Sequence, residues 1–223
     1  MEIVALSLRV ALWAAVWSLP IAIAVAFVLA RKRFPGKTLF DAAVHLPLVL
    51  PPVVVGFALL ALFGRNGPLG SVLEPLGITF AFRWTGAALA CAIMGFPLMV
   101  RAIRLSIDAI DTRLELAART LGASRTRVFF TVTLPLAWPG LVTGTLLAFA
   151  RALGEFGATI TFVSNIPGET QTLPLAIYTF TQVPGQDAQA LRLSIISVLL
   201  SLLALAFSEW LVRRHAPGEP RDA

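Results

Sequence analysis

Long, mostly apolar runs alternate with short polar segments along this chain. A helix of about 20 residues crosses a hydrocarbon core about 30 Å thick, and lipid offers an irregular backbone no hydrogen-bond partners. The pattern therefore predicts an all-α, polytopic bundle of transmembrane helices in a single domain over residues 1–215, with a disordered tail at 216–223. The predicted spans, about five in number, cover residues 10–30, 44–63, 84–104, 134–163 and 193–212.

The second run contains several residues that break helices. Pro47, Pro51, Pro52 and Gly56 lie within one uncharged segment. Such residues are tolerated inside a membrane only where neighbouring protein or a water-filled cavity satisfies the freed backbone groups. Two interpretations stay open. The segment is either a proline-kinked helix that packs inside the bundle, or a broken region, with Pro51 and Pro52, that lines a substrate route.

A charged, amphipathic segment from Arg101 to Thr133 separates the third and fourth runs. It holds six of the 18 Lys and Arg residues and three of the 12 acidic residues. Apolar residues recur in it at steps of three and four, which places them on one face of a helix. This apolar stripe consists of Ile103, Ile107, Ile110, Leu114, Ala117 or Ala118, and Leu121. Gly122 predicts the end of the helix, because glycine tolerates a left-handed backbone. The segment is either a surface helix on its own bundle or a docking helix for a soluble partner.

The fourth run combines small residues with a pair of charges. A ridge of small residues at steps of four is formed by Gly140, Gly144, Ala148 and Ala152. Such ridges let helix backbones approach closely. At 100° per residue, Arg151 and Glu155 share the face of this ridge, so they face protein rather than lipid. They either neutralise each other as an i, i+4 pair or lie on the pathway of an ionic substrate.

The basic residues are distributed unevenly between the loops. With the N-terminus outside, five spans put residues 31–41, 101–133 and 213–223 on one side, and these hold 13 of the 18 Lys and Arg residues. Basic loops stay in the cytoplasm, so we expect an external N-terminus and a cytoplasmic C-terminus. Membrane topology thus explains the net charge of +6, and no nucleic-acid partner is expected.

Composition narrows the function classes further. With 57% hydrophobic and only 13% charged residues, the chain is an integral membrane protein. Cys91 is the only cysteine, and His45 and His215 are isolated, so neither an intrachain disulfide nor a metal site is expected. Apart from Arg151 and Glu155, the spans offer few groups for catalysis. A stand-alone membrane enzyme is therefore less favoured, whereas a structural membrane scaffold stays open.

The segment from Glu115 to Pro135 resembles a signature found in known cytoplasmic loops. Glu115-Leu116-Ala117-Ala118 is followed after three residues by Gly122, and after nine more by Val132-Thr133-Leu134-Pro135. This resembles the EAA signature of permease subunits in binding-protein-dependent ABC importers. Two departures are present: Glu115 lies one place early, with Leu116 at the usual glutamate position, and Val132 replaces isoleucine. The shift leaves open whether Glu115 contacts the ATPase.

Nearly the whole chain resembles one branch of that family, the molybdate ABC transporter permeases. The resemblance rests on HLPLVLPPVVVG (45–56), FPLMVRAIRL (96–105), LAARTLGASRTRVFFTVTLP (116–135) and ARALGEFGATITFVSNIPGET (150–170). It implies a type I ABC importer permease fold in a bacterial inner membrane, with a cytoplasmic coupling helix in a loop over about residues 106–132. It also implies a homodimer, two cytoplasmic ABC ATPase subunits and a periplasmic molybdate-binding protein. ATP and Mg then belong to the ATPase, and this chain binds no cofactor and is not an enzyme.

The resemblance also suggests roles for individual residues. It implies that the coupling helix inserts into a groove of the ATPase and that ATP-driven closure moves the spans by alternating access. The residues expected to couple the chain to the ATPase are Leu114, Glu115, Ala117, Ala118, Leu121, Gly122, Ala123 and Arg125. The residues expected to line the translocation pathway are Arg151, Glu155, Gly144, Pro51 and Pro52. Tungstate, sulfate and thiosulfate are the alternative substrates to molybdate.

Overall fold

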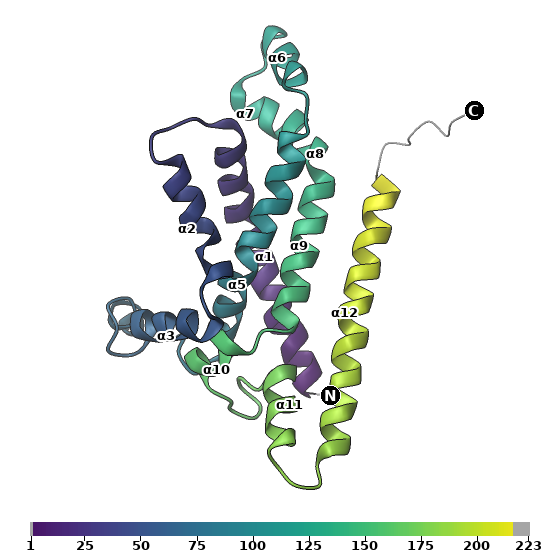
Figure 1. Ribbon diagram of the computed structural model, residues 1–223. Helices are drawn as coiled ribbons and strands as arrows, with labels where there is room; N and C mark the ends of the chain where they lie inside the picture. Colours follow the sequence, from purple (N-terminus) through teal and green to yellow (C-terminus); the bar gives the residue numbers. More distant parts are fainter. Residues whose placement is uncertain (1, 216–223) are drawn as a thin grey trace, which may run out of the picture.

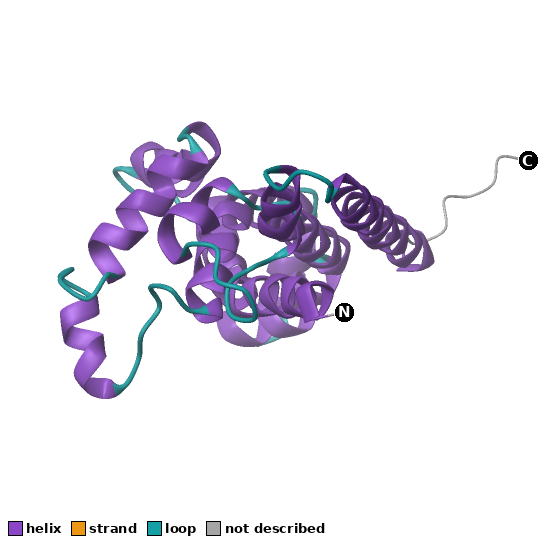
Figure 2. Cartoon of the chain, turned by 90° about the horizontal axis from the view of Figure 1, so that it is seen from below, coloured by secondary structure: helices purple, strands orange, loops and turns teal. Residues whose placement is uncertain are grey.

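Residues 2–215 are described in the computed structural model, and every regular element among them is a helix (Figures 1 and 2). The tail 216–223, for which disorder is predicted, lies outside the described residues. The elements are α1 (Glu2–Arg31), α2 (Lys37–Val49), α3 (Pro52–Phe63), α4 (Gly70–Leu73), the 3₁₀ helix η1 (Glu74–Leu76), α5 (Trp84–Asp108), α6 (Thr112–Thr120), α7 (Arg125–Val128), the π-helix η2 (Phe129–Thr133), α8 (Leu134–Leu136), α9 (Trp138–Leu153), α10 (Gly157–Val163), α11 (Leu173–Thr181) and α12 (Asp187–His215).

The centre of the bundle is formed by α1, α5 and α9, with α5 packed along both of the others. Two hydrophobic cores lie along these helices. One includes Val10, Met94 and Phe162, and the other includes Leu29 and Ile103. Alanines fill much of both cores, so the helices approach closely. The bundle therefore depends on small side chains as much as on large ones.

The ridge of small residues predicted on α9 packs against α5. A Cβ atom added at Gly140 would lie 2.3 Å from Ser106 Cβ, and one at Gly144 would lie 3.0 Å from the carbonyl oxygen of Met99. At Gly140 the two helices therefore meet at a distance that only glycine permits, and at Gly144 a side chain would force the backbone of Met99 to shift. Gly144 is accordingly a packing residue between α5 and α9.

The chain breaks sharply between α2 and α3, at the prolines of the second apolar run. The two helices meet at 110°, and α3 begins at Pro52. α3 packs on α10, which comes from a distant part of the sequence. In Figure 1, α2 and α3 form an elbow to one side of the central helices. Of the two interpretations of this run, the broken region describes the backbone.

Within residues 2–215, three helices are long and apolar enough to cross a membrane: Glu2–Arg31, Trp84–Asp108 and Asp187–Phe207. The number rises to five if two bent pairs, α2 with α3 and the segment Arg125–Leu136 with α9, each count as one span. The prediction of an all-α bundle is confirmed. The predicted span 134–163 is divided among α8, α9 and α10 by breaks at Ala137 and Gly154. The division of the chain into spans stays a prediction.

The two ends of the bundle carry different elements. α6 and α7 project at one end, and α10 and α11 lie towards the other (Figure 1). α1 runs from the α11 end to the α6 end, and its Ser7 Oγ accepts a hydrogen bond from Leu173 N at the start of α11 (2.7 Å). α12 returns along the outside of α9, to one side of the other helices in Figure 2.

Candidate functional site

The loop between α5 and α9 (residues 109–137) folds around the short helix α6. Asp111 caps its start, because Asp111 Oδ1 accepts a hydrogen bond from Arg113 N at 2.9 Å. At its end Gly122 has φ of 88°. The Gly122 N–H donates to the carbonyl of Arg119, and the next N–H donates to that of Ala118. These two bonds form a Schellman motif, so the predicted helix end at Gly122 is confirmed.

Leucine side chains are exposed on this loop. Leu114, Leu116 and Leu121 expose 50%, 56% and 90% of their surface. The isoleucines of the predicted stripe are instead buried in the bundle, namely Ile103, Ile107 and Ile110. The expectation of one continuous apolar stripe is therefore wrong, because α5 ends at Asp108 and the chain turns before α6. Leu114 and Leu121 lie seven positions apart and therefore share one side of α6, whereas Leu116 lies on another side. Leu114 and Leu121, named here the leucine surface, are left uncovered.

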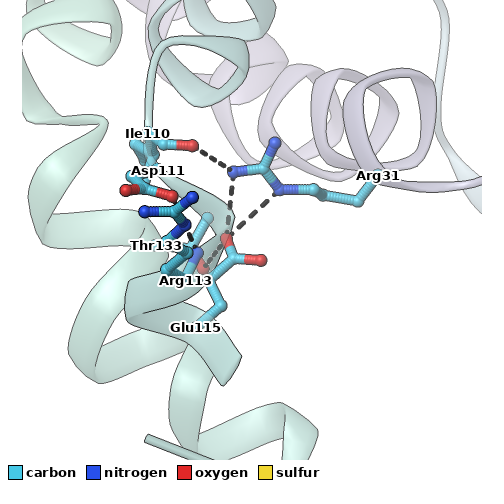
Figure 3. A network of polar contacts seen from close by, with 6 residues as sticks. All are labelled: Arg31, Ile110, Asp111, Arg113, Glu115 and Thr133. Atoms are coloured by element: carbon cyan, nitrogen blue, oxygen red, sulfur yellow. Dashed lines mark hydrogen bonds and ion pairs between the residues drawn. The ribbon is translucent and has the colours of Figure 1, made fainter. Parts of the chain in front are cut away.

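Glu115 points towards Arg31, the last residue of α1 (Figure 3). Arg31 Nε and Nη2 donate to Glu115 Oε1 at 3.2 and 3.1 Å, and Thr133 Oγ1 donates to the same oxygen at 2.9 Å. Arg31 Nη2 also donates to the carbonyl oxygen of Ile110 at 3.3 Å. The side chains of Arg31 and Glu115 are only 15% and 18% exposed. The network therefore joins α1, α6 and η2 through a shielded ion pair.

The other residues expected to couple the chain to a partner lie around the same turn. Ala117 and Arg125 are exposed, whereas Ala118 and Ala123 are half-buried. A cavity of about 480 Å³ lies between the end of α1 and the loop, and residues of α1, α6 and the returning arm line it. The charged side chains that line it are Arg31, Lys32, Glu115, Arg119 and Arg125. The lining of this cavity is therefore basic, and the carboxylate of Glu115 is already bound to arginine.

A second charged feature lies where α9 ends. Arg151 Nη1 is 2.6 Å from Glu155 Oε2, and Glu155 Oε1 accepts a hydrogen bond from Ala158 N at 2.8 Å. The Glu155 side chain is 1% exposed, whereas that of Arg151 is 30% exposed. Burying a lone carboxylate is costly unless it is paired and hydrogen-bonded. Arg151 therefore neutralises Glu155, which holds the turn into α10 through Ala158 N. Part of the Arg151 side chain stays accessible.

The elbow between α2 and α3 lies beside this pair. A Cβ atom added at Gly157, two residues after Glu155, would lie 2.7 Å from Pro52 Cβ. The structure thus brings the Pro51–Pro52 break close to the charged end of α9. Gly144 does not join them, since it lies about two helical turns before Arg151 and packs on α5.

Sequence reasoning missed the contributions of Arg31 and Thr133. Arg31 belongs to a run of basic residues after the first span, and such a run indicates only which side of the membrane the loop lies on. It is 84 positions from Glu115, so no local spacing connects the two residues. The displacement of Glu115 from the usual glutamate position was the available signal that its carboxylate has another partner.

Comparison with known proteins relates these features to one family. Residues 18–216 match the family described as binding-protein-dependent transport system inner membrane component. The molybdenum transport system permease protein ModB of Escherichia coli (strain K12) is 61% identical over 213 residues, which cover 95% of this chain and 93% of that protein. ModB of Haemophilus influenzae is 59% identical over 210 residues, covering 94% and 92%. The sulfate transport system permease protein CysW of Synechococcus elongatus is 42% identical over 175 residues, covering 77% and 61%.

Solved structures share the fold at low sequence identity. A bacterial alginate ABC transporter in complex with a pentasaccharide-bound periplasmic protein superposes with a TM-score of 0.74 at 17% identity, covering 96% of this chain and 78% of that chain. An inward-facing MetNI methionine ABC transporter gives 0.69 at 18% identity, covering 96% and 92%. The family match over residues 18–216, together with 61% identity to a permease, shows that this chain belongs to the binding-protein-dependent transport system inner membrane components.

Proposed function

We propose that this chain is the permease subunit of an ATP-driven ABC importer that moves molybdate into the cytoplasm by alternating access. The observation that carries the proposal is the leucine surface, which projects on the loop that bears the importer signature. Exposed apolar patches on a protein surface mark interaction sites. The identity of 61% with a molybdenum transport permease supports a molybdenum oxyanion as the cargo.

In this proposal α6 faces the cytoplasm. The basic segments 31–41 and 101–133 lie at the α6 end of the bundle, and basic segments stay on the cytoplasmic side. α1 then begins on the periplasmic side, and α12 ends on the cytoplasmic side. The far end, with α10 and α11, is left to receive the substrate from outside.

The proposed partners follow from this orientation. Two cytoplasmic ABC ATPase subunits bind at the leucine surface and supply ATP and Mg, and a periplasmic molybdate-binding protein docks at the α11 end. A second copy of the chain completes a homodimer in the lipid bilayer. Within residues 2–215, no group of three or more His, Cys, Asp or Glu side chains is placed to hold a metal ion.

The pathway is proposed to run past Arg151 and the elbow between α2 and α3. Molybdate is a dianion, and a buried anion needs a positive partner. The Arg151 side chain is partly accessible, and Glu155 Oε2 lies 2.6 Å from Arg151 Nη1. The carboxylate partly neutralises the guanidinium, so the anion is attracted but bound only weakly. Pro51 and Pro52 interrupt the helix beside this pair, which frees backbone groups to face a water-filled route. Gly144 serves the pathway only by holding α9 against α5.

The function is tested by reconstituting the chain in vesicles with its ATPase and binding protein. We expect the ATPase to copurify with the chain, and molybdate to accumulate only when ATP is hydrolysed. Sulfate is the second candidate because a sulfate permease is 42% identical. Uptake of sulfate but not molybdate would overturn the proposed cargo. A chain that binds no ATPase would overturn the permease assignment itself.

Removing both charges at the end of α9 tests the pathway. The double variant Arg151→Gln, Glu155→Gln leaves no uncompensated charge buried, so the bundle stays folded. Because truncating one partner of a buried charge contact typically costs about 2–5 kcal/mol in binding, loss of the arginine should lower molybdate uptake by about tenfold or more. The exposed Arg192→Gln is the control. Undiminished uptake in the double variant would show that the pair is structural only.

A substitution at Gly122 tests whether transport requires the intact end of α6. Valine at φ of 88° adopts a left-handed backbone that costs about 1–2 kcal/mol, although no neighbouring atom lies within 4 Å. We therefore expect Gly122→Val to lower ATP-coupled uptake by about fivefold or more while the permease still inserts. Gly185→Val is the matched control, since its φ is 83° with open space around it, at the opposite end of the bundle. Normal uptake with Gly122→Val would refute the role of this turn.

A further inference from the structure

The carboxylate of Glu115 lies on the inner side of the α5–α9 loop. Its Oε1 atom accepts hydrogen bonds from Arg31 Nε, Arg31 Nη2 and Thr133 Oγ1, all within 3.2 Å. Thr133 is itself buried. Leu116, at the position where the importer signature usually has glutamate, is exposed instead. The Glu115 carboxylate is therefore bound by residues of its own chain and is not available to a soluble partner.

The same contacts give the loop a third attachment to the bundle. Covalently, the loop is joined to α5 at one end and to α9 at the other. The Glu115–Thr133 hydrogen bond joins the outgoing and returning arms, and Arg31 binds Glu115 and the Ile110 carbonyl of the outgoing arm to the end of α1. The Phe27 ring of α1 adds an edge contact to Phe129 of η2, with centroids 4.9 Å apart. Three helices of the central bundle thus hold the loop.

The geometry points to a clamp, formed by Arg31, Glu115 and Thr133, that transmits movement of α6 to α1 as well as to α9. This inference rests on the proposed function, because it assumes that the ATPase moves α6. α1 packs along α5 and α9 and runs the full length of the bundle. A displacement at α6 therefore reaches the α11 end through α1, without passing through the break at Gly154. The three residues are positioning residues and do not contact the substrate.

A π-helix lies at the base of the clamp. η2 holds Thr133 Oγ1 within 2.9 Å of Glu115, at the point where the returning arm meets the span. π-helical turns are rare and occur frequently at functional sites. Thr133 is the last residue of η2, and its side chain is buried. A hydroxyl at this position is therefore a specific requirement of the clamp.

The clamp is tested by measuring molybdate taken up per ATP hydrolysed in the reconstituted complex. Allosteric couplings are commonly worth factors of about 5 to 150, so Glu115→Gln and Arg31→Gln should each lower this ratio about fivefold or more. The double variant should be no worse than either single variant, because both remove one interaction. ATPase binding by pull-down should stay within about twofold of wild type, since the leucine surface is untouched. The exposed Arg65→Gln, from an ion pair with Glu74 outside this network, is the control.

Thr133 gives a second measurement that does not alter charge. Thr133→Val removes only the hydroxyl and should lower the uptake per ATP, whereas Thr133→Ser keeps the donor and should restore it. The clamp is refuted if Glu115→Gln alone weakens ATPase binding. It is also refuted if the effects of Glu115→Gln and Arg31→Gln on uptake per ATP add up in the double variant, or if Thr133→Val and Thr133→Ser give the same uptake per ATP. A wild-type complex that takes up no molybdate would instead refute the proposed function.

Discussion

Replacing Leu121 by aspartate is expected to release the ATPase from the permease. Leu121 is 90% exposed at the end of α6, so the substitution does not disturb the isolated bundle. In a complex, however, a buried aspartate without a partner is strongly unfavourable. Interface hot spots cost about 2 kcal/mol or more when truncated, so we expect at least about a 30-fold loss of affinity. Copurification and titration of the ATPase measure the effect.

The control for Leu121 is another exposed leucine, outside the loop that carries α6. Leu76 is 69% exposed at the end of η1, and Leu76→Asp adds the same charge there. It should leave ATPase affinity unchanged. Equal ATPase binding by the two aspartate variants would mean that the leucine surface is not the docking site.

A methyl group added at Gly56 is expected to separate α3 from α10. The new Cβ would lie 2.5 Å from the carbonyl oxygen of Ala158 and 2.9 Å from its Cα atom. Alanine in place of helical glycine normally gains roughly 0.5–1 kcal/mol, but a clash with backbone cannot be relieved by a rotamer change. Overpacking costs typically about 1–3 kcal/mol, so the melting temperature of Gly56→Ala should fall by roughly 2–12 °C.

Gly154 provides the matched substitution for Gly56. It lies at the end of α9, at the break before α10, with φ of −97°, and a methyl group added there would have no neighbouring atom within 4 Å. Gly154→Ala should therefore leave the melting temperature of the detergent-solubilised permease within about 2 °C of wild type. An equal fall in both variants would show that the α3–α10 contact does not limit stability.

Much of the helical arrangement could be predicted from the sequence because the membrane restricts the choices. Long apolar runs must be helices, and prolines in an uncharged segment mark a break, as found between α2 and α3. The end of α6 was predictable for a local reason, since a left-handed turn needs glycine. Helical periodicity offered the pairing of Arg151 with Glu155 as one of two interpretations, and the pair forms although α9 ends at Leu153, before Glu155.

Periodicity could not identify what covers each apolar side chain. The stripe from Ile103 to Leu121 has one spacing in the sequence, yet its first half is buried by the bundle and its last leucine is exposed. The turn after Asp108 separates the two halves, and no glycine or proline between α5 and α6 marks it. The contact of Arg31 with Glu115 was hidden for a related reason, because it depends on how distant helices pack.

The position of α12 has a consequence for how the protein is made. The fully buried residues of both cores come from earlier parts of the chain, and α12 packs on the outside of α9 and α11. Only 6% of its most apolar window is buried. Chains fold during synthesis as their segments emerge, so the interior of the bundle can assemble while α12 is still inside the ribosome and the insertion machinery. The order of synthesis thus matches the order of packing, with the outermost helix last.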